Sequence, residues 1–168
     1  MKRQPSPLEV TALRAARRRS WIFTGIGVAA ALVMLLLSSE FVALHCIVLA
    51  AVTLAASLSC AWAATQVAPA TARRAGMLGG MTAAMAYVLP FMALFIFRLV
   101  TLDEATAARM AGELSVAQAT NLGQQNIVPG VEYFRGQYVS YVAGYLLFGL
   151  TFGMLLGTLG GILARPKQ

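Results

Sequence analysis

The sequence predicts an all-α, multi-pass membrane protein whose core is a four-transmembrane-helix bundle. Composition is the first reason: 59% of the 168 residues are hydrophobic and 11% are charged, whereas a soluble domain has about 25% charged residues. The second reason is four long apolar stretches, each near the roughly 17–25 residues that cross a bilayer as a helix. These stretches lack the polar–apolar alternation of membrane β-strands, and helices satisfy every backbone polar group in lipid.

The chain begins with a basic segment, residues 1–20, which we expect to form a cytoplasmic interfacial helix. Ser6, Pro7 and Glu9 have the spacing of a capping box, with proline at the first helical position. The apolar face of this helix is small, so its attachment to the membrane surface should be weak. We expect it to turn into the first span near Arg19.

Residues 21–164 form the predicted transmembrane domain. The link at residues 38–40 is so short that the first two spans must form an antiparallel hairpin. Pro69, followed by two arginines, predicts a cytoplasmic turn, and Pro90 predicts a kink in the third span because proline removes a helical hydrogen bond. The four spans are expected at residues 21–38, 41–65, 75–100 and 138–164.

The largest segment between spans, residues 101–137, is predicted to lie outside the cytoplasm as a short helical segment. Thr101 and Glu104 have capping-box spacing, and the helix should continue to Gln118 before Gly123 disrupts it. The segment is too small for an independent domain. It has the size to dock on a partner or to cap the bundle.

Basic residues predict the orientation of the chain. Ten of the 13 Lys and Arg residues fall on one side of the predicted spans, and the positive-inside rule places that side, with both termini, in the cytoplasm of a cell (inner) membrane. The basic character therefore indicates topology rather than nucleic-acid binding. The expected partners are the lipid bilayer and other membrane-protein subunits or a second copy. The three basic residues on the outer side are Arg98, Arg109 and Arg135.

Two rows of small residues are the sharpest pattern in the sequence. They consist of Gly149, Gly153, Gly157 and Gly161 in the fourth span, and of Gly76, Gly80 and Ala84 in the third. Residues four apart share a helix face, and small residues let helices in lipid approach closely. Two interpretations are the main ones: the rows pack on each other within the chain, or the fourth-span row, as a glycine zipper, faces another subunit. A glycine-lined pore is the remaining alternative.

Three residues near the outer end of the spans could form a polar site. His45 lies about one turn inside the second span, near Glu40, and could serve as a haem or chlorin ligand or take part in proton transfer. We expect a structural role instead, with no cofactor. Arg98 should extend to the lipid headgroups or pair with an acid such as Glu40.

The sequence contains no recognised catalytic motif and no metal-ligand spacing, so we predict a protein that is not an enzyme. The leading hypothesis is an accessory or scaffold subunit that associates with other membrane proteins through the glycine-row helix. One alternative is a small oligomeric transporter or channel, with Thr24, Thr53, Ser57, Thr82 and Thr151 as candidate lining residues. The other is a cofactor-binding membrane subunit centred on His45.

Overall fold

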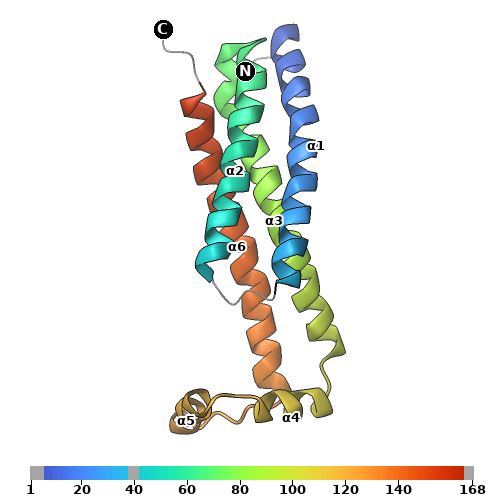
Figure 1. Cartoon of the computed structure of the whole chain (residues 1–168), viewed down its shortest axis with the longest axis vertical. Coiled ribbons are helices and arrows are strands. Elements are labelled where there is room, and N and C mark those ends of the chain that lie inside the picture. Colours follow the sequence, from blue (N-terminus) through green and yellow to red (C-terminus); the bar gives the residue numbers. More distant parts are fainter. Residues whose placement is uncertain (1–5, 38–41, 165–168) are drawn as a thin grey trace, which may run out of the picture. The chain divides into compact units, whose positions relative to one another are not determined.

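The computed structural model describes residues 6–37 and 42–164, and every regular element in these residues is helical (Figure 1). A single 3-10 turn, η1 (Pro69–Thr71), precedes the third long helix. The α-helices are α1 (Pro7–Leu36), α2 (Val42–Thr65), α3 (Ala72–Thr101), α4 (Glu104–Gly112), α5 (Val116–Gln124) and α6 (Val131–Leu163).

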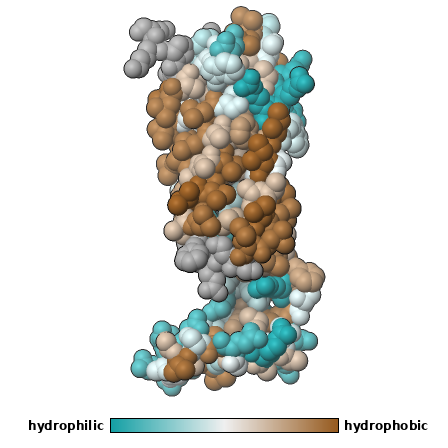
Figure 2. Space-filling model, viewed as in Figure 1, coloured by the Kyte–Doolittle hydropathy of each residue, from teal (hydrophilic) through white to brown (hydrophobic). Residues whose placement is uncertain are grey.

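Four helices, α1, α2, α3 and α6, are long and apolar enough to cross a membrane. The predicted number of long apolar helices is thus confirmed, and it fits a multi-pass membrane protein. Large apolar side chains are exposed along these helices, as expected of surfaces that face lipid; Trp21, Ile47 and Leu155 are examples. Figure 2 shows apolar residues over the long helices and hydrophilic residues gathered over α4 and α5.

The first helix is longer than the first apolar stretch. Its capping box forms as predicted: the Glu9 amide donates to Ser6 Oγ at 3.3 Å, and the Ser6 amide donates to Glu9 Oε2 at 2.7 Å. α1 then runs without a break past Arg19, so residues 7–20 extend the first span and do not form a separate helix. Buried Ala12 and Ala16 pack with α2 and α3 residues along this extension.

The chain divides into two compact units, with the boundaries after Pro90 in α3 and after Tyr145 in α6. The first unit holds α1, α2, the first part of α3 and the last part of α6. Its buried residues are mostly small, so its helices pack closely; they include Ala56, Ala61, Ala64, Ala75, Ala83 and Ala84. α3 passes through Pro90 as one helix, and the kink expected there stays a prediction.

The second unit, residues 91–145, has an aromatic interior. Phe91 stacks on Tyr145 with ring centroids 5.2 Å apart, and Phe95 lies against the rings of Tyr141 and Tyr145. A second group of buried residues connects α4 to α6 and consists of Leu102, Ala107, Phe134 and Tyr138. Aromatic pairs of this kind add stability beyond the area that they bury.

The outer segment differs from the single helix expected through Gln118. It forms two helices, because α4 ends at Gly112 and a new capping box opens α5. In this box the backbone N–H of Gln118 donates to Ser115 Oγ, and the backbone N–H of Ser115 donates to Gln118 Oε1. The start of α4 also differs, since Asp103 rather than Thr101 is its N-cap residue.

Candidate functional site

The glycine row of α6 faces α3 within the chain. Gly149, Gly153, Gly157 and Gly161 are all buried. A Cβ added at Gly153 would lie 2.9 Å from Met81 Cα, and one added at Gly161 would lie 2.8 Å from Arg73 Cα. Both distances are shorter than the contacts that real Cβ atoms make, so the separation of these two helices requires glycine.

The row on α3 meets the α6 row. A Cβ at Gly76 would lie 2.6 Å from Gly161 Cα, and a Cβ at Gly80 would lie 2.6 Å from Gly157 Cα. Ala84 completes the row, since its Cβ lies 3.3 Å from the position of a Cβ at Gly153. We call this α3–α6 contact the glycine seam. Of the two interpretations, packing of the rows within the chain describes the structure, and the α6 row is not free to face another subunit.

Ser57 of α2 lies against the glycine seam, and the other hydroxyl residues considered for a channel lie on several helices. Ser57 Oγ donates a hydrogen bond to the Gly157 carbonyl oxygen at 2.6 Å. Thr24 and Thr82 donate to carbonyls of their own helices, at 2.9 and 3.0 Å. Thr53 is fully buried, and its hydroxyl has no hydrogen-bond partner in the part of the chain that the structure describes. Three of the hydroxyls proposed for a channel therefore donate to backbone carbonyl oxygens, and only that of Ser57 bonds to another helix.

The packing of Cys60 of α2 against α1 and α3 was not predicted from the sequence. Cys60 is buried, and its thiol lies 3.4 Å from the Ala16 carbonyl oxygen of α1. A Cβ at Gly79 would lie 2.5 Å from Cys60 Sγ and 3.1 Å from the Ala56 carbonyl oxygen, so α3 also packs against α2. The signal was present, because α2 carries small residues at helical spacing: Ala56, Ser57, Cys60 and Ala64.

His45 contacts a tyrosine in the structure. Its Nδ1 lies 3.0 Å from the Tyr87 hydroxyl oxygen, and the two rings meet edge to face. His45 is half-buried and Tyr87 is almost fully buried. This contact links α2 to α3. The described residues contain no group of three or more His, Cys, Asp or Glu able to hold a metal ion.

The two other candidates for the polar site are Glu40 and Arg98. Glu40 lies outside the described residues. The Arg98 side chain is exposed near the end of α3 and takes part in none of the ion pairs found between described residues. Its predicted contact with lipid headgroups stays a prediction.

At the basic end of the chain, Arg19 joins α1 to α2. Its guanidinium lies 5.0 Å from the centroid of the Trp62 ring, and its Nη1 donates to Ser59 Oγ at 3.3 Å. A cation over an indole face is attracted to the ring electrons. The sequence analysis treated this arginine only as a determinant of topology.

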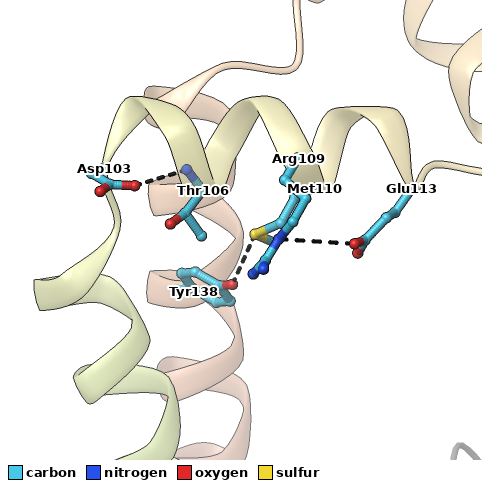
Figure 3. A network of polar contacts seen from close by, with 6 residues as sticks. All are labelled: Asp103, Thr106, Arg109, Met110, Glu113 and Tyr138. Carbon is cyan, nitrogen blue, oxygen red and sulfur yellow. Dashed lines mark hydrogen bonds and ion pairs between the residues drawn. The ribbon is translucent and has the colours of Figure 1, made fainter.

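The outer helices differ in how much they bury. α4 contacts α6 through Tyr138, whose hydroxyl lies 3.5 Å from Met110 Sδ, and it carries an exposed ion pair between Arg109 and Glu113 (Figure 3). Hydrogen bonding from Thr106 holds the pKa of the Asp103 carboxyl below its usual value. In contrast, α5 has no buried residue.

Comparison with known proteins finds no matching family model, and no curated protein or solved structure is significantly similar to the chain.

Proposed function

We propose that this protein is a non-catalytic accessory subunit of a larger complex in a cell (inner) membrane, with both termini in the cytoplasm. The observation that carries the proposal is α5, a capped helix that buries no residue of its own. Because α3 occupies the glycine row of α6, the contact with a partner moves from that row to the outer segment.

The composition of α5 suits a protein partner. The stretch 114–131 contains no charged residue, and the centres of protein interfaces are depleted of charge. Helical spacing places Val116, Ala119, Leu122 and Gly123 on one side of α5, and Val116 is 84% exposed. The remaining side carries amides and a threonine, which form hydrogen bonds at no cost of burying a charge.

The length of α5 supports the same conclusion. A helix of nine residues is marginal in water unless another surface packs against it. The capping box at Ser115 stabilises its first turn, but none of its residues is buried within the chain. A partner that covers the Val116 side would supply the missing packing.

Crosslinking in cells tests this proposal. A photoreactive amino acid is placed at Ala119 on α5, and a matched control is placed at Ala108, which is exposed on α4. We expect a discrete protein adduct from position 119 and much less from position 108. Substitution of Val116 and Leu122 by aspartate should remove the adduct and the proteins that co-purify in mild detergent.

Two results would contradict the proposal. One is a position-119 probe that reacts only with lipid, because α5 would then lie on the bilayer surface. The other is a chain that behaves as a lone monomer after mild detergent extraction and yields no protein adduct.

A further inference from the structure

A groove between α1 and α3 lies in the first unit, whereas α5 belongs to the second, so this groove does not depend on the proposed function. Its volume is about 290 Å³, near the lower limit for small-molecule pockets. It therefore fits a narrow ligand segment such as one hydrocarbon chain. The groove is lined by Leu13, Ala16, Arg17 and Ser20 of α1 and by Ala75, Leu78, Gly79 and Thr82 of α3.

The groove combines a cationic side chain with a mostly apolar lining. Arg17 and Ser20 lie in the last turn before the long apolar run that begins at Trp21. On α3, Leu78 and Thr82 lie one and two turns after Arg74. The Thr82 hydroxyl donates to the Gly79 carbonyl oxygen of its own helix, so it needs no partner in the groove. A cation beside an apolar lining suits a phospholipid, which joins a phosphate to acyl chains.

The positive charge beside the groove has no free acidic counterpart in the described part of the first unit. Glu9 is the only acid in the described part of the first unit, and its carboxylate accepts from the Ser6 amide at the helix cap. Arg19 is engaged with Trp62, but Arg17 is exposed. The other exposed arginines in the described part of this unit are Arg14, Arg18, Arg73 and Arg74. This excess of cations complements an anionic headgroup.

Ser20 restricts what the headgroup can offer. Its hydroxyl donates to the Arg17 carbonyl oxygen at 2.8 Å, so its proton is committed and its oxygen is left as an acceptor. The phosphodiester group of a lipid, whose oxygens only accept hydrogen bonds, would gain its contact from the Arg17 guanidinium. A headgroup hydroxyl could donate to Ser20 Oγ. The pair therefore fits a phosphate that carries a hydroxylated headgroup.

We propose that this groove binds one anionic phospholipid of the phosphatidylglycerol type. Its phosphate pairs with Arg17, and one acyl chain lies along Leu78 and Thr82. The site differs from general attraction to an anionic surface, because it requires both the arginine at its mouth and the apolar groove.

Native mass spectrometry of the full chain in detergent tests the site, with phosphatidylglycerol as the probe. Arg17→Gln should weaken retention of the lipid about fivefold, as expected for one lost arginine contact. The matched control is Arg18→Gln, which removes the same charge one residue away, outside the groove; its effect should be less than twofold. Leu78→Trp, which fills the groove and keeps every charge, should also weaken retention.

Three results would overturn the proposal. Equal losses in Arg17→Gln and Arg18→Gln would show diffuse attraction. Retention of phosphatidylcholine equal to that of phosphatidylglycerol would show no recognition of charge. Competition by millimolar inorganic phosphate, with no effect of Leu78→Trp, would show an anion site that does not hold a lipid. Circular dichroism spectra of the variants identify any loss that comes from unfolding.

Discussion

Asp103 fixes where the first outer helix begins. Its Oδ1 accepts a hydrogen bond from the Thr106 amide at 2.8 Å, which satisfies a backbone donor that no helical carbonyl can reach. Thr101 has the right side chain for this role, but its hydroxyl donates to the Phe97 carbonyl oxygen within α3. The spacing of residues could not distinguish the two, because the outcome depends on how far α3 continues.

The low pKa of Asp103 makes the first turn of α4 sensitive to acid. Thr106 hydrogen bonds favour the ionised form, so the folded pKa lies below the usual value of 3.8. The stabilisation is complete above 3.8 and is lost as pH falls through the lower folded pKa. We expect the hydrogen-exchange protection factor of the Thr106 amide to fall in this acid range.

Asp103→Asn is the matched variant, because asparagine also caps helices but does not ionise there. Its Thr106 protection should be lower at neutral pH and nearly constant down to the acid range. An unchanged pH dependence in Asp103→Asn would show that another group titrates.

At the scale of helices, the glycine seam explains why α3 and α6 pack so closely. Close van der Waals contact is a main source of helix association in lipid, since apolar burial contributes little there. Glycine is normally unfavourable inside a helix by about 1 kcal/mol. The seam offsets this cost only where another backbone fills the space, as Gly157 does for Gly80.

Substitutions by alanine test the seam. Gly76→Ala and Gly80→Ala place a methyl group 2.6 Å from the α6 backbone, so the helices must separate. We expect each to destabilise the protein by about 1–3 kcal/mol, as overpacking usually does, measured as a lower thermal midpoint in detergent.

Gly144→Ala is the control, because a Cβ there meets nothing within 4 Å. It should leave the midpoint unchanged or raise it through better helix propensity. A Gly80→Ala variant as stable as Gly144→Ala would show that α3 and α6 do not pack closely at Gly80.

The sequence was sufficient for the spans and for the existence of the two rows. Long apolar runs and four-residue spacing are local patterns, and the structure has four long helices and a seam built from both rows. What the α6 row contacts depends on tertiary structure, so residue spacing alone could not decide between packing within the chain and contact with another subunit. The split of the outer helix could have been found, because Ser115 and Gln118 have capping-box spacing.

Over the whole chain, charge is the property that relates these helices to a membrane. The basic residues concentrate near the amino terminus, in the first turn of α3 and after α6, whereas five of the six acids follow residue 37. Lys and Arg in short loops resist transfer across a bilayer, which is the origin of the positive-inside rule. The proposed orientation therefore places α5 outside the cytoplasm and η1 on the cytoplasmic side.

Labelling of single cysteines tests this orientation. In a background with Cys46→Ala and Cys60→Ala, one new cysteine replaces Gln124 at the end of α5, and in a second variant it replaces Ala70 in η1; both positions are exposed. A maleimide that does not cross membranes should label the Gln124→Cys variant in intact spheroplasts. It should label Ala70→Cys only after the membrane is opened, because that loop precedes Arg73 and Arg74 on the cytoplasmic side. The reverse pattern would invert the proposed topology, and labelling of both variants in intact spheroplasts would contradict a span between them.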